Sequence, residues 1–122
     1  MARVPEVARK RRTQPPPPHV LYEALTDPDR DPARPWLLLH DDEQRPMITG
    51  SVERNLVVWT SLWPLHPDAN IRFDIDGSPG GSATLTWTLI LDSPVPDAAT
   101  IIRMRKRLNV LINANLRFTF GQ

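Results

Sequence analysis

The feature that most constrains this chain is a change in the spacing of its apolar residues, from every second residue to about every 3.6 residues. Between residues 47 and 92 apolar and polar side chains alternate, which predicts antiparallel strands buried on one face. From residue 98 to residue 118 the apolar residues recur at helical spacing, which predicts one long amphipathic helix. A half-wetted sheet and a single helix bury their apolar faces against each other, so the expected fold class is α+β with two layers.

The pattern also gives the bounds of these elements. The expected strands are Met47–Glu53, Leu56–Trp63, Asn70–Asp76 and Ala83–Asp92, with a tight turn at 54–55. Asp97 is a suitable N-cap for the helix, and Gly121 fits the position just after its end. The apolar face of the helix is expected to comprise Ile101, Met104, Leu108, Leu111, Ile112 and Phe118, with Arg103, Lys106, Arg107 and Arg117 opposite.

Four consecutive prolines, Pro15–Pro18, divide the N-terminal part of the chain. Residues 1–14 before them are basic and form either a polar strand or a tail. After them, His19–Thr26 is expected to form a short helix that stops at Asp27–Pro32, and Trp36–Leu39 stays open between helix and strand. We treat residues 1–122 as a single domain, because a chain of 122 residues supports one core.

Composition excludes several classes of function. Fifteen Lys and Arg against fourteen Asp and Glu give a net charge of +1, so we expect no nucleic-acid partner. The absence of cysteine excludes a disulfide scaffold, a thiolate metal site and a cysteine nucleophile. No apolar segment is long enough to span a bilayer and the start has no apolar signal region, so we expect a cytoplasmic protein without integral membrane association.

Metal binding and triad chemistry are not expected from the residues present. Asp27, Asp29 and Asp31 imitate the start of a calcium loop, but Pro32 and Leu38 stand where the loop needs glycine and glutamate. The run 40–43, HDDE, could also bind a metal, but consecutive residues rarely converge on one ion, so we expect an exposed turn there. The three histidines (His19, His40 and His66) are far apart in the sequence, so no Ser/His/Asp arrangement can be argued, and we expect no metal and no cofactor.

The segment Pro17–Pro28, PPHVLYEALTDP, followed by Trp36, resembles the opening of the SRPBCC (START-like, polyketide-cyclase-like) superfamily. The ending Arg107–Gln122 resembles that of small uncharacterised bacterial members. The resemblance implies a helix-grip fold, in which a curved antiparallel sheet wraps around a long C-terminal α-helix, with short helices after the first strand. It also implies a hydrophobic cavity between sheet and helix that binds a lipid-like or polycyclic ligand. This chain is short for that superfamily, so it has fewer or shorter strands.

Strand parity and helix angle give the residues expected to line such a cavity. They are Trp59, Phe73, Trp87, Met104, Leu108, Leu111 and Asn115. Asn115 falls near the middle of the apolar arc, where an unpaired amide costs about 1–3 kcal/mol. It therefore either orients a ligand or bonds to sheet backbone or water, and the tryptophans are either cavity wall or ordinary core.

Three functions remain open from the sequence. The first is binding of a small hydrophobic molecule. The second is a polyketide cyclase/aromatase-type enzyme, for which the candidate polar groups are Tyr22, Asp74, Arg105 and Asn115. The third is a protein–protein interaction module without ligand, and residues 56–63, apolar on both faces, could form a homodimer contact. The segment Arg12–Pro18, RTQPPPP, matches a basic-x-x-Pro-x-x-Pro recognition ligand, but any basic stretch before four prolines matches by chance. The basic run Arg9–Arg12 could also meet a nucleic acid, but a solvated face is the favoured interpretation.

Overall fold

The computed structural model describes residues 6–91 and 96–120. Its elements are β1 (Glu6–Gln14), α1 (Pro18–Thr26), β2 (Ile48–Val52), β3 (Leu56–Trp59), β4 (Asn70–Gly77), the 3-10 turn η1 (Pro79–Gly81), β5 (Ala83–Ile90), α2 (Ala98–Val110) and the π-helical segment η2 (Leu111–Leu116). None of the described helices is long and apolar enough to cross a membrane.

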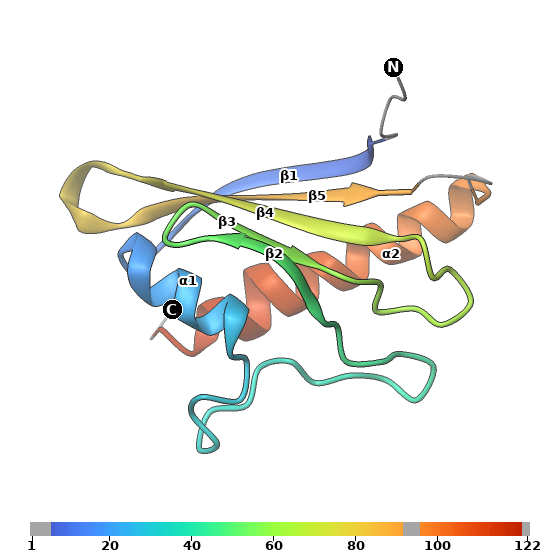
Figure 1. Cartoon of the computed structure of the whole chain (residues 1–122), viewed down its shortest axis with the longest axis horizontal. Helices are drawn as coiled ribbons and strands as arrows, with labels where there is room; N and C mark the ends of the chain where they lie inside the picture. The colour runs from blue at the N-terminus through green and yellow to red at the C-terminus, as the bar shows by residue number, and fades with distance from the viewer. Residues whose placement is uncertain (1–5, 92–95, 121–122) are drawn as a thin grey trace.

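The five strands form one antiparallel sheet in the order β1-β5-β4-β3-β2, and α2 with η2 lies across one face of it (Figure 1). β4 and β5 pair along their whole length, which sets Phe73 opposite Trp87. Because side chains alternate between the two faces of a strand, this register directs both rings toward the helix. The expected α+β class and the arrangement of a curved sheet against a C-terminal helix are confirmed.

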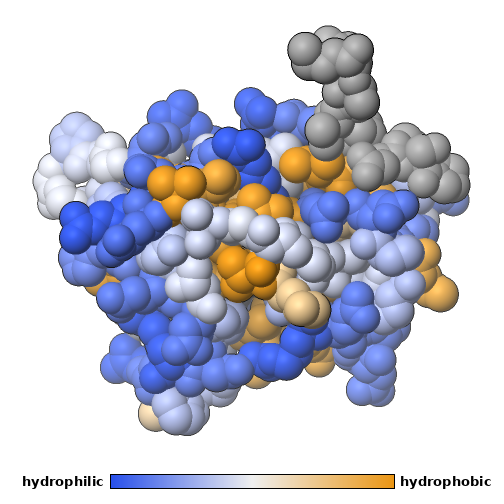
Figure 2. Space-filling view, in the orientation of Figure 1, coloured by the Kyte–Doolittle hydropathy of each residue, from blue (hydrophilic) through white to orange (hydrophobic). Residues whose placement is uncertain are grey.

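The basic N-terminal segment is a strand and not a tail. β1 pairs with β5 from Glu6 to Gln14, so it forms one edge of the sheet, and β2 forms the other. Exposed apolar side chains occur around β2, where Met47, Ile48 and Val52 are 71%, 39% and 52% exposed. On the face seen in Figure 2, hydrophobic residues surface near the middle and hydrophilic residues surround them.

The core between sheet and helix is built around stacked aromatic rings. Trp59 meets Phe73 edge-on at 4.7 Å between ring centroids and stacks on Trp36 at 5.9 Å. The indole Nε1 of Trp59 also donates to the backbone oxygen of Leu25 at 2.9 Å, which fixes α1 to β3. Edge-on and stacked ring pairs of this kind contribute about 0.5–1.5 kcal/mol each beyond burial. The short helix and the segment after it are therefore held onto the sheet by β3.

The C-terminal helix departs from its expected phase. It is helical over the expected range, and Asp97 caps it by accepting a bond from the Thr100 backbone N–H at 2.8 Å. From Leu111 to Leu116 its turns widen to π-helix, which inserts about one extra residue and rotates the end of the helix by about 100°. The expectation that Phe118 lies on the buried face is therefore wrong, because the rotation leaves it 75% exposed.

Three smaller expectations also differ from the structure. The strand expected over 56–63 ends at Trp59, and residues 60–63 continue as a loop. The segment Trp36–Leu39 is neither helix nor strand, so α1 is the single helix between β1 and β2 instead of the several expected. Ile101 is half-buried rather than in the core. The expectations for Asp92 and Gly121 lie outside the described residues.

Candidate functional site

Most of the seven residues expected to line a cavity lie together in the buried core. Six of them belong to the same buried core, each 0–3% exposed: Trp59, Phe73, Trp87, Met104, Leu108 and Leu111. Asn115 is half-buried at the rim. Met104 and Asn115 do reach open space, but in two different grooves. The structure thus brings the apolar members together as packed interior, and the two grooves that Met104 and Asn115 reach lie on either side of the segment 36–43.

The more apolar volume, here called the C-terminal groove, runs between residues 33–38 and the end of the helix and encloses about 800 Å³. Five of its lining residues are apolar: Ala33, Pro35, Leu38, Ala114 and Phe118. The other three, Arg34, Asn115 and Thr119, carry polar side chains. Leu38 and Phe118 are 54% and 75% exposed, so two large apolar side chains face solvent within it. An open apolar hollow with a few convergent polar groups is the usual form of a small-molecule site.

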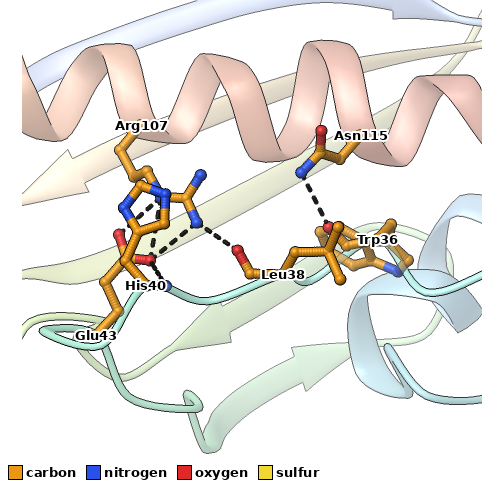
Figure 3. A network of polar contacts seen from close by, with 6 residues as sticks. All are labelled: Trp36, Leu38, His40, Glu43, Arg107 and Asn115. Carbon is orange, nitrogen blue, oxygen red and sulfur yellow. Dashed lines mark hydrogen bonds and ion pairs between the residues drawn. The ribbon is translucent and has the colours of Figure 1, made fainter.

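Two hydrogen bonds shape this groove. The Asn115 amide Nδ2 donates to the backbone oxygen of Trp36 at 3.3 Å, which ties the end of the helix to the segment over the sheet (Figure 3). The Arg34 guanidinium donates to the backbone oxygen of Thr119 at 3.0 Å. Asn115 therefore bonds backbone, as the structural interpretation of this residue required, but the backbone belongs to residues 36–39 and not to the sheet.

A buried ion pair separates the C-terminal groove from a second one. The Arg107 guanidinium donates to both carboxylate oxygens of Glu43, with Nε–Oε2 at 2.8 Å and Nη2–Oε1 at 2.9 Å, and also to the backbone oxygen of Leu38 (Figure 3). The backbone N–H of His40 donates to the same carboxylate at 2.8 Å. The side chains of Arg107 and Glu43 are 12% and 2% exposed, so the pair anchors residues 38–43 to α2.

The surroundings of Glu43 keep it ionised. Burial raises the pKa of Glu43, but the hydrogen bonds from Arg107 and from the His40 backbone, with the positive charge of Arg107, outweigh it. The pKa of this carboxyl therefore lies below its ordinary value. A carboxylate held in this way acts as an anchor and not as a proton donor near neutral pH.

The second volume, here called the basic groove, lies between residues 40–43, the loop 63–66 and one side of α2 from Thr100 to Val110, and encloses about 590 Å³. Apolar side chains such as Trp63 and Met104 line it together with Arg103 and Lys106. His40 and His66, which are distant in the sequence, both contribute to its wall. Within the described residues, no three His, Asp or Glu side chains are grouped so that they could hold a metal ion.

The polar residues proposed for catalysis are not brought together. Asp74 pairs with Arg72 at 3.0 Å on the face of β4 that points away from the core, while Arg105 is exposed on α2. Tyr22 is half-buried on α1 and packs against the core. The ion pair between Glu43 and Arg107 was not expected, because residues 64 positions apart with ordinary charges carry no sequence signal of their pairing.

The fold is that of a helix-grip protein, and within the described residues its two most prominent grooves lie at the margins of the C-terminal helix. No protein-family model and no curated protein matches the chain. Among solved structures, it is similar to the Aha1 dimer from Colwellia psychrerythraea, with a TM-score of 0.61, 14% identity and coverage of 88% of this chain and 91% of that one. It is also similar to CalU16 from Micromonospora echinospora, with a TM-score of 0.54, 14% identity and coverage of 87% and 86%. At this identity the likeness establishes the fold alone.

Proposed function

We propose that this protein binds a small hydrophobic molecule in the C-terminal groove. The observation that carries the proposal is the open apolar surface of Leu38 and Phe118 around a hollow of about 800 Å³. Large apolar side chains that share one hollow on a surface commonly mark a ligand site. Arg34 at the same wall would suit a ligand with an apolar body and one anionic or hydrogen-bond-accepting end.

The helix-grip fold and the resemblance to the SRPBCC superfamily support a lipid-like or polycyclic ligand. That Trp59, Phe73, Trp87, Met104, Leu108 and Leu111 line a ligand space stays a prediction, since it requires a ligand to part the helix from the sheet. Cytoplasmic location and a homodimer also stay predictions. The similar structure from Colwellia psychrerythraea is a dimer, and exposed apolar residues of this chain lie along the β2 edge.

Binding is better supported than cyclase-type catalysis. A cyclase needs groups in its cavity that exchange protons with the substrate. In the C-terminal groove the polar side chains are an arginine, an amide and a threonine, and the buried carboxylate of Glu43 is committed to Arg107.

The experiment uses 8-anilinonaphthalene-1-sulfonate, an apolar aromatic dye with one anionic group, as a fluorescent probe. Leu38→Gln should weaken its binding about fivefold to tenfold, because the loss of one apolar contact of this size is worth roughly 1–1.5 kcal/mol. Val52→Gln is the matched control, since Val52 is 52% exposed against 54% for Leu38 and lies on β2, outside the groove.

Equal effects of the two substitutions would overturn the proposal. Unchanged binding in Leu38→Gln together with weakened binding in Leu111→Ala would move the site to the interior between sheet and helix. Native mass spectrometry of protein purified from cells provides an independent measure, because a retained molecule adds mass to the wild type and should be depleted in Leu38→Gln.

A further inference from the structure

The positive charge of this protein is concentrated on two neighbouring elements. β1 carries Arg9–Arg12 and α2 carries four more cationic side chains, and the two elements hold a single acidic residue, Glu6. Glu43 neutralises Arg107, and Glu6 pairs with Arg9 at 2.6 Å. Since the whole chain has a net charge of +1, the rest of it is negative. Arg103, Lys106 and Arg107 line the groove beside residues 40–43, so the basic side of the molecule at the sheet edge is formed by β1 itself.

A groove of about 330 Å³ lies between β1 and the helix on this basic side. Lys10 and Arg12 line it from the strand, and Asn109 and Asn113 line it from the helix. The two amides are fixed, because Asn113 donates to Asn109 at 3.1 Å and accepts from Gln14 at 2.8 Å. The wall opposite the two cations is thus rigid and already hydrogen-bonded, while the cations themselves are exposed.

β1 is also an open edge of the sheet. Within the described residues it pairs with β5 alone, in eight residue pairs from Glu6 to Gln14, and Arg9–Thr13 are all exposed. The Thr13 carbonyl accepts a bond from Arg117, so the open part of the edge is Arg9–Arg12. The outer side of an edge strand presents unpaired backbone N–H and C=O groups that can accept a further strand. Figure 1 shows β1 at the edge of the sheet, and the groove lined by Lys10 and Arg12 lies along the same strand.

We propose that this edge binds an acidic, extended polypeptide segment of another protein, which adds to the sheet beside β1. The inward side chains of an added strand recur every two residues, about 6.6–6.8 Å apart, which is also the spacing of Lys10 and Arg12 along β1. The preferred segment therefore carries Asp or Glu at alternate positions, so that two carboxylates meet the two cations. Its outward side chains face Arg9 and Arg11.

Charge selects this occupant over the others that an open edge could take. A second copy pairing through its own β1 would set Arg9–Arg12 beside an identical basic run, which costs energy through like-charge repulsion. A nucleic acid would meet the cations, but no aromatic side chain lines this groove to stack on a base. An acidic strand satisfies both the backbone edge and the cations.

The test uses a fluorescein-labelled peptide of alternating valine and glutamate, ten residues long, and a second peptide with glutamine in place of glutamate. We expect the acidic peptide to bind and the neutral one to bind at least tenfold more weakly. Lys10→Glu/Arg12→Glu should weaken the acidic peptide about tenfold or more, since two attractive contacts become repulsive. Arg103→Glu/Arg105→Glu, with the same change of net charge on α2, should leave most of the binding intact.

Two further measurements separate strand addition from simple charge attraction. N-methylation of alternate peptide amides removes the backbone donors and should abolish binding, while amide hydrogen exchange in β1 should slow when the unmodified peptide is present. Equal loss in both charge-reversal variants, or full binding of the N-methylated peptide, overturns the proposal. If Lys10→Glu/Arg12→Glu unfolds, Lys10→Gln/Arg12→Gln replaces it, and tighter binding of a single-stranded oligonucleotide at the same two residues would also refute the proposal.

Discussion

Replacement of Glu43 by glutamine tests whether the ion pair with Arg107 holds the segment between the two grooves. The change keeps the shape of the side chain but removes its charge and one of its acceptor oxygens. Arg107, whose side chain is 12% exposed, is then left with its charge uncompensated. The backbone N–H of His40 keeps an acceptor only if the new amide turns its oxygen toward it.

The expected cost comes from burial and geometry. Breaking a fully buried pair by removing one partner costs about 3–5 kcal/mol, and Arg107 keeps some contact with water, so we expect about 2–3 kcal/mol. In a chain of this length that loss lowers the midpoint of thermal unfolding by roughly 6–15 °C. Adding Arg107→Met should recover part of the loss, because the double variant no longer carries an unpaired charge.

The pH dependence of stability gives a second, independent test of the ion pair. The pKa of Glu43 is lowered on folding, so its contribution to stability is complete above the ordinary value of 4.5 and disappears as the pH falls through the lowered folded value. Glu43→Gln should therefore be much less stable than wild type at pH 7, and the gap should narrow steadily below about pH 4.5. Urea unfolding of wild type, both single variants and the double variant at pH 7 and pH 3.5 measures this. A gap that is the same at both pH values would refute the argument.

Three other predictions concern single side chains. Arg54 has a φ of +69°, so Arg54→Gly should raise the free energy of unfolding by about 0.5–1 kcal/mol in urea titrations, and a loss of stability would contradict this turn geometry. Within the described residues the buried indole N–H of Trp87 has no hydrogen-bond partner, whereas that of Trp59 donates to the Leu25 carbonyl. Trp59→Phe should therefore lower the free energy of unfolding by about 1–3 kcal/mol more than Trp87→Phe, and equal losses would contradict this argument. Asn115→Leu should lower stability by about 1 kcal/mol, and a stabler variant with weaker dye binding would instead make Asn115 a ligand group.

The fold could be predicted because each of its main elements carries its own local signal. β4 alternates so regularly that Ile71, Phe73 and Ile75 are all buried, and the helical spacing after Asp97 marks the helix over its whole length. Periodicity reports which face of an element is apolar, and two such faces leave few ways to pack. β1 could not be distinguished from a tail in the sequence, because four charged residues in a row have no apolar period.

The grooves could not be predicted, because they depend on contacts between distant residues. In the sequence Glu43 and Arg107 look like any other charged residues. Only the fold brings Nε of Arg107 to 2.8 Å from Oε2 of Glu43. The resemblance implied an interior cavity and strand parity predicted which residues would line it, but parity does not show how much volume those residues fill. The rings of Trp36, Trp59 and Phe73 pack against one another in this interior.

The π-helical segment explains why the end of the helix serves a groove and not the core. With ideal α-helical phase, Asn115 would lie near the centre of the buried face and Phe118 near its margin. The wider turns bring Leu116 into the core instead, move Asn115 to the rim and turn Phe118 to solvent. Two polar contacts with β1 hold the irregular turn in place: the buried Gln14 donates to the Asn113 side chain, and Arg117, just after the segment, donates to the Thr13 carbonyl. π-Helical turns are often found at functional sites, and here one such turn contains Asn115 and sets the direction of the exposed ring of Phe118, which follows it, in the proposed ligand groove.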